Sequence, residues 1–77
     1  MAKIIYIVED DDTLRNVLSE KLKASRSEVG EATNGEEGLA LMRAKKPDVV
    51  LLDMLMPIMG GMETLEQMQK DDALKTI

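Results

Sequence analysis

Apolar and polar positions alternate along the chain in blocks that predict three strands and three helices. Short apolar runs bounded by turn-forming residues indicate strands at about residues 3–8, 28–32 and 48–52. Apolar residues at helical spacing, together with capping residues and helix stops, predict helices at about residues 12–24, 35–45 and 62–70. Such alternation builds a parallel sheet with right-handed crossovers, so we expect an α/β fold with (βα)3 topology.

The third apolar run ends on Asp53 in the segment VVLLDMLMP. If the second strand lies outside the first, the strand order is 2-1-3 and the chain changes its direction of travel between the first and third strands. A crevice opens at the carboxyl ends of the strands at such a point. Glu9 and Asp10 leave the first strand there, and Asp53 leaves the third. We therefore expect three carboxylates to face one small space.

Carboxylates held close together repel one another, which raises the proton affinity of at least one of them unless a cation neutralises the group. Oxygen ligands without histidine or cysteine favour a hard ion, and Mg²⁺ tolerates one or two carboxylates with waters and a phosphate. An ion beside an exposed aspartate suits phosphoryl transfer, in which the Asp53 oxygen attacks and forms an acyl phosphate.

Each of these acids also has a purely structural interpretation. Residues 9–12 can cap the following helix, and Asp53 can end a strand as a turn former. Asp11 and Asp12 are assigned to capping, and the acids at 71 and 72 to a solvated turn. The methionines after Met1 are interpreted as core filling rather than as a soft-metal site.

Two other phosphate-handling sites do not fit the sequence. No glycine-rich loop follows the first strand, and its four consecutive acids would repel a pyrophosphate, which disfavours dinucleotide and P-loop sites. Phosphatases of the dehalogenase type also form an aspartyl phosphate, but they carry a second acid two residues after the nucleophile. That position is Leu55 here.

The composition limits the remaining possibilities. The chain has 77 residues and no cysteine or histidine, which excludes disulfides and Cys/His metal sites. A net charge of −5 without a basic cluster argues against direct binding to nucleic acid or to an anionic membrane. The apolar run after Lys3 is too short for a signal peptide core or a membrane span. We expect one cytoplasmic domain, residues 1–77.

Three segments carry a family resemblance: IIYIVEDDDTLRNVL, EATNGEEGLALM and PDVVLLDMLMPIMGGMETLEQMQ. Together they resemble the receiver domain of bacterial two-component response regulators over the whole chain. The decisive spacing is the acid pair after the first strand, Asp53 after the third, Pro57 four residues on and Gly61 four residues beyond that. The resemblance implies a three-layer, flavodoxin-like arrangement and a phosphoacceptor signalling domain rather than an enzyme.

The resemblance also assigns site residues and partners. It implies that Asp53 accepts the phosphoryl group from a sensor histidine kinase, and that Pro57 and Gly61 shape the following loop. It implies a Mg²⁺ site formed by Glu9, Asp10, Asp53 and the backbone carbonyl of Leu55. Pro57 should restrict its preceding residue to extended geometry, and Gly61 should permit a tight turn into the third helix.

The chain departs from the family in extent. Receiver domains have about five βα units, and the family's Ser or Thr after the fourth strand and Lys after the fifth have no counterpart here. We therefore expect the N-terminal half of the fold, ending before the fourth strand, with impaired signalling. The third strand is then an apolar edge, which predicts self-association, most simply as a homodimer. The alternative is a truncated or engineered half-domain that acts as a self-assembling structural fragment with an idle acidic pocket.

Overall fold

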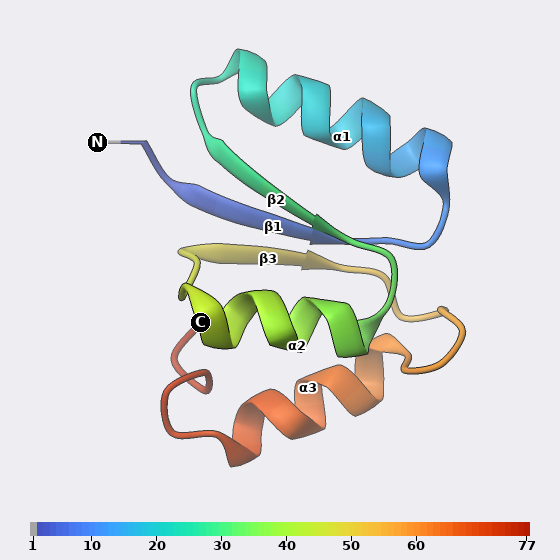
Figure 1. Ribbon diagram of the computed structural model, residues 1–77, viewed down its shortest axis with the longest axis vertical. Coiled ribbons are helices and arrows are strands. Elements are labelled where there is room, and N and C mark those ends of the chain that lie inside the picture. The colour runs from blue at the N-terminus through green and yellow to red at the C-terminus, as the bar shows by residue number, and fades with distance from the viewer. Residues whose placement is uncertain (1) are drawn as a thin grey trace.

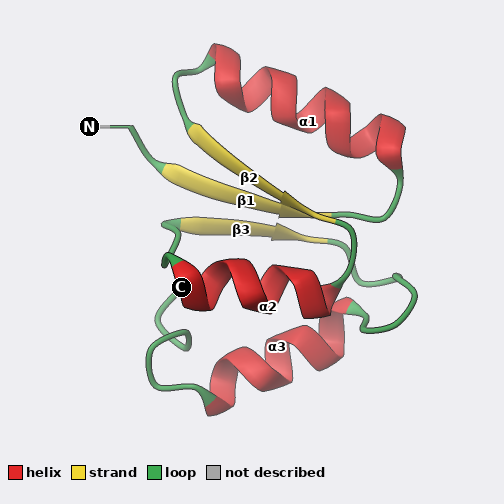
Figure 2. Ribbon diagram, viewed as in Figure 1, coloured by secondary structure: helices red, strands yellow, loops and turns green. Residues whose placement is uncertain are grey.

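Strands and helices alternate strictly along the chain, as the sequence pattern predicts. The computed structural model describes residues 2–77 (Figures 1 and 2). Its elements are β1 (Ile4–Val8), α1 (Asp12–Ala24), β2 (Glu28–Ala32), α2 (Gly35–Ala44), β3 (Val49–Leu52) and α3 (Gly61–Lys70). The predicted bounds agree with these to within one residue, because apolar runs and capping residues mark most of the ends.

The three strands form one parallel sheet in the order β2-β1-β3, which confirms the expected topology. β1 is the central strand, with Tyr6 aligned to Gly30 on one side and to Val50 on the other. Helix α1 covers one face of the sheet, whereas α2 and α3 lie on the opposite face (Figure 1). The fold is therefore the expected three-layer α/β half fold.

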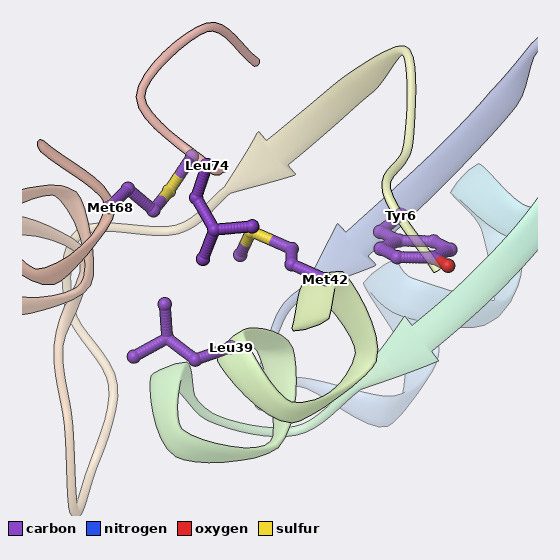
Figure 3. Close-up of a cluster of buried hydrophobic side chains, with 5 residues drawn as sticks. All are labelled: Tyr6, Leu39, Met42, Met68 and Leu74. Carbon is purple, nitrogen blue, oxygen red and sulfur yellow. The ribbon is translucent and has the colours of Figure 1, made fainter. Parts of the chain in front are cut away.

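The main core lies between the sheet and the α2–α3 layer. Figure 3 shows its side chains, which come from β1, α2, α3 and the C-terminal turn: Tyr6, Leu39, Met42, Met68 and Leu74. Full burial of one such side chain contributes about 1.5–3 kcal/mol. The last seven residues are thus part of the fold, because Leu74 is as deeply buried as Met42.

Gly30 makes room for the single aromatic side chain. A Cβ atom at Gly30 would lie 2.6 Å from Cδ1 of Tyr6. The Tyr6 ring packs across β2 at this point, and its hydroxyl donates a hydrogen bond of 2.5 Å to the backbone carbonyl of Lys45. The glycine in β2 therefore allows β1, β2 and the end of α2 to approach one another closely.

The expectation that the methionines after Met1 fill the core is only partly correct. Met42 and Met68 are buried, but Met54 and Met62 are exposed. Both exposed methionines lie in or next to the segment that joins β3 to α3. On α3, Met68 is buried together with Gly61 and Thr64, whereas Met62 is not.

Candidate functional site

The three predicted carboxylates lie together where β1 and β3 end. Glu9, Asp10 and Asp53 each offer a carboxylate oxygen, and these oxygens all lie within 4.8 Å of one another. The backbone explains the convergence, because the Glu9 N–H donates to the carbonyl of Ala32 at 3.0 Å and the Asp53 N–H donates to the carbonyl of Val8 at 3.0 Å. Parallel pairing thus continues as far as both acids and fixes them at one end of the sheet.

Glu9 is the most enclosed member of this group, with 8% of its surface exposed. Its Oε2 accepts a hydrogen bond of 3.1 Å from the Asp11 backbone N–H. That bond lowers the pKa of Glu9, but burial, the Asp10 side chain and the negative charge of Asp53 together outweigh it, so the pKa is raised above its ordinary value. The cluster therefore disfavours its own full ionisation, and a bound cation would relieve the repulsion.

The donor set fits a hard divalent ion such as Mg²⁺. All three side chains offer oxygen, and the sequence has no cysteine thiolate or histidine imidazole. Glu9 and Asp10 are adjacent on the β1–α1 loop, whereas Asp53 comes from the end of β3. An ion held by these residues would join two strands.

Asp11 takes the structural role that the sequence assigned to it. It is the N-cap of α1, and its Oδ1 accepts a hydrogen bond of 2.9 Å from the Leu14 N–H. Asp12 lies one residue further on, in the first helical turn. The four consecutive acids therefore divide into two that face Asp53 and two that serve the start of the helix.

Arg15 contacts the site, although the sequence reasoning did not single it out. Its Nη1 donates a hydrogen bond of 2.9 Å to the backbone carbonyl of Glu9, and its Nη2 pairs with Asp12. A weaker ion pair of 3.7 Å joins Nε to Glu31. Arg15 braces the loop that carries Glu9 and Asp10. The i,i+3 spacing to Asp12 was its only signal in the sequence.

Asp53 is half-buried and begins a tight loop. Its Oδ1 accepts a hydrogen bond of 3.2 Å from the backbone N–H of Leu55. Leu55 is 85% exposed. One Asp53 oxygen is therefore oriented by the loop, and the ligand role of the Leu55 carbonyl stays a prediction.

The sharp turn of the β3–α3 loop occurs at Ile58, not at Gly61. Ile58 has φ of 68°, and the Met59 N–H donates to the Pro57 carbonyl at 2.7 Å, which together define a strained γ-turn. No glycine described in the structure has a positive φ. Gly61 therefore does not act through a left-handed backbone, and its role in shaping the loop stays a prediction.

Gly61 is needed instead for a close approach. It is the first residue of α3, and a Cβ atom there would lie 2.5 Å from the backbone oxygen of Asp53. Its N–H donates to the Met54 carbonyl at 3.1 Å. The missing side chain thus lets the start of α3 pack directly against the residue that follows β3.

The chain matches a known family. The model of the response regulator receiver domain matches residues 5–77. The chain belongs to this family. It is 36% identical over 73 residues to the chemotaxis protein CheY of Halobacterium salinarum, covering 95% of this chain and 61% of that protein.

Solved receiver structures share the fold. The N-terminal domain of a response regulator receiver protein from Methanoculleus marisnigri is 35% identical with a TM-score of 0.95, over 100% of this chain and 63% of that one. TrrA from Thermotoga maritima, solved in complex with Mg²⁺-BeF, is 34% identical with a TM-score of 0.84, over 91% of this chain and 61% of that one.

The receiver chain described here spans less than two thirds of the length of these proteins. Receiver domains are signalling modules that pair with histidine kinases and bind Mg²⁺ at an acidic pocket. Within residues 2–77, none of the helices is both long and apolar enough to cross a membrane.

Proposed function

We propose that this receiver chain accepts a phosphoryl group on Asp53 within a two-component phosphorelay. The observation that supports the proposal is the convergence of three carboxylate oxygens within 4.8 Å, contributed by two separate strand ends. Asp11 caps α1 and Asp12 lies in its first turn, but the start of a helix does not account for an acid from β3 meeting two acids from the β1–α1 loop. The family provides the reaction class.

The reaction transfers one phosphoryl group between side chains. An Asp53 carboxylate oxygen attacks the phosphorus of a phosphohistidine, the P–N bond breaks, and an acyl phosphate forms on Asp53. The leaving imidazole nitrogen keeps the electron pair and takes up a proton from water. The hydrogen bond from the Leu55 N–H to Oδ1 limits the rotation of the Asp53 carboxylate, so its attacking oxygen is already oriented.

Glu9, Asp10 and Asp53 are the residues that would hold Mg²⁺, together with the carbonyl of Leu55. When bound, the ion would neutralise charge on the transferring phosphoryl oxygens. Arg15 keeps Glu9 in place through its backbone carbonyl, and the loop that contains Pro57 and ends at Gly61 supports Asp53 from the other side.

Further parts of the proposal concern the cellular setting. We place the chain in the cytoplasm with a sensor histidine kinase as donor, and without direct binding to nucleic acid, in keeping with its net charge of −5.

Amide NMR with a phosphate mimic tests the proposal. Mg²⁺ with beryllofluoride should shift the amide signals of residues 9–10 and 53–55 in the wild-type chain. The Asp53→Asn variant should not show the beryllofluoride-dependent shifts, whereas Glu66→Gln, an exposed carboxylate on α3, should respond like wild type. Identical responses of wild type and Asp53→Asn would remove the phosphoacceptor proposal. The idle acidic pocket of a structural fragment would then be the better explanation.

A further inference from the structure

The guanidinium group of Arg15 connects three parts of the fold beside the acidic cluster. Nη1 donates to the Glu9 carbonyl at the end of β1, Nη2 pairs with Asp12 in the first turn of α1, and Nε lies 3.7 Å from Glu31 on β2. The Arg15 side chain is 13% exposed. A rigid planar fork that contacts three separate oxygens is held in one orientation, so Arg15 is a fixed point next to the β1–α1 loop.

The contact with the Glu9 carbonyl is the important one of the three. The Asp12 side chain is 81% exposed, and an exposed ion pair contributes little to the fold. The Glu9 carbonyl is instead part-buried, and a charged donor forms a stronger hydrogen bond to it than a neutral donor does. The two acidic side chains therefore orient Arg15, and Arg15 in turn holds the backbone of Glu9.

This carbonyl belongs to the peptide bond between Glu9 and Asp10. A peptide unit is planar, so a hydrogen bond to its oxygen also fixes the direction in which the chain enters Asp10. The other side of Glu9 is held as well, because its N–H donates to the Ala32 carbonyl at 3.0 Å. One arginine contact therefore determines the placement of both acids that the β1–α1 loop contributes to the cluster.

We propose that Arg15 is a positioning residue for the ion site and raises the affinity of the three carboxylates for Mg²⁺. This inference rests on the proposed function, because it concerns the same site. The carboxylate oxygens of Glu9, Asp10 and Asp53 lie within 4.8 Å of one another, and their mutual repulsion favours a loop that moves apart. By restraining the loop, Arg15 keeps the ligands arranged before the ion arrives, which reduces the cost of binding.

The other possible roles of Arg15 predict different changes in affinity. A positive charge beside a cation site repels the ion, so a purely electrostatic role means that loss of Arg15 strengthens Mg²⁺ binding. A role in stability alone means that the folded chain binds Mg²⁺ as before. Positioning means that binding becomes weaker even though a repelling charge has been removed. The direction of the change in Kd therefore distinguishes the three roles.

Titration of the isotope-labelled chain with MgCl₂ alone, followed by the amide signals of residues 9–10 and 53, measures this Kd. For Arg15→Met we expect a Kd about tenfold higher than for wild type, the effect typical of groups that orient metal ligands. Arg15→Lys keeps the charge but lacks the planar fork, so its Kd should lie between the two. Arg43→Met is the matched control, because Arg43 pairs with Asp71 at the end of α2 and should not affect the site.

Hydrogen exchange without Mg²⁺ provides a local measurement on the same variants. In Arg15→Met, the Glu9 and Asp11 amides should exchange faster than in wild type, whereas the Tyr6 amide in the middle of β1 should be unaffected. A general loss of stability would accelerate all three. Such a general loss overturns the inference, because it shows that the loop is not specifically released.

The titration can overturn the inference in two further ways. An Arg15→Met chain that binds Mg²⁺ as tightly as wild type, or more tightly, excludes positioning. If Arg15→Met does not fold, Arg15→Lys gives the same test, and a Kd equal to that of wild type overturns the inference. Failure of the proposed function is recognised separately, because the wild-type chain itself would then show no response to Mg²⁺ at residues 9–10 and 53.

Discussion

At the residue scale, Ile58 stands out because a β-branched side chain occupies the left-handed region of the backbone. Its φ is 68°, and 76% of its surface is exposed. Left-handed geometry costs a residue with a Cβ roughly 1–2 kcal/mol, and an exposed side chain recovers little of this by packing. The fold therefore tolerates strain five residues after Asp53, at the turn that leads into α3.

Replacing Ile58 with asparagine should stabilise the chain. Asparagine adopts this geometry more readily, so we expect the free energy of unfolding to rise by about 1 kcal/mol. Urea denaturation measures the change. Met62→Asn, at an exposed position with ordinary helical geometry, should not raise stability. If both variants change stability equally, backbone strain at Ile58 is not the cause.

Glu9 provides a second prediction at this scale. Its raised pKa means that the folded state binds a proton more tightly than the unfolded state does. The resulting stabilisation is present below the unfolded pKa and is lost as the pH rises through the folded pKa. Without divalent ions, Glu9→Gln should therefore be more stable than wild type at pH 7, since it removes the repulsion but keeps an oxygen to accept from the Asp11 N–H.

The pH dependence and added ions check this explanation. The advantage of Glu9→Gln in chemical denaturation should disappear when the pH falls below the ordinary glutamate value of 4.5. Mg²⁺ should stabilise wild type more than the variant, by RT ln(1 + [Mg²⁺]/Kd). Glu20→Gln, an exposed carboxylate on α1, is the matched control. An equal gain in both variants would show a general charge effect instead.

At the element scale, α2 is held at its start by reciprocal hydrogen bonds. The Asn34 side chain accepts from the Glu37 N–H at 3.0 Å, and Glu37 Oε1 accepts from the N–H and the hydroxyl of Thr33, each at 2.9 Å. Both hydrogen bonds lower the pKa of Glu37, and the bond from the Thr33 backbone N–H has the larger effect. This arrangement resembles a capping box shifted by one residue.

The contribution of this shifted capping arrangement to the stability of the chain should depend on pH. The contribution of Glu37 is present above the unfolded pKa, near 4.5, and is lost as the pH falls through the lowered folded value. Glu37→Gln should therefore lower stability at pH 7, and its difference from wild type should shrink below pH 4.5. Glu36→Gln occupies the same helical turn without these bonds and is the control for the helix dipole. Thermal unfolding across pH measures both.

Elements were more predictable from the sequence than side-chain detail. The apolar runs, the cap at Asn34 and the stop at Pro47 are determined by interactions between residues that are close in the sequence, so the sequence pattern reveals them. Acids at the ends of β1 and β3 followed from strand order. The turn at Ile58 could not be anticipated, because isoleucine is a poor residue for positive φ and tertiary packing overrides its preference. Arg15 was missed because it contacts the site through the backbone carbonyl of Glu9, which carries no side-chain signal in the sequence.

At the scale of the whole molecule, the location of Tyr6 has a practical consequence for spectroscopy. Its ring lies against Gly30 and its hydroxyl binds the carbonyl of Lys45, in the α2 layer and away from the carboxylates. As the chain's one aromatic side chain, it dominates near-ultraviolet absorbance and intrinsic emission. Absorbance and emission of Tyr6 will therefore report unfolding of the core, and they will change little when an ion or a phosphate mimic binds. Ligand titrations on this chain therefore require an isotope label or an attached dye near Asp53.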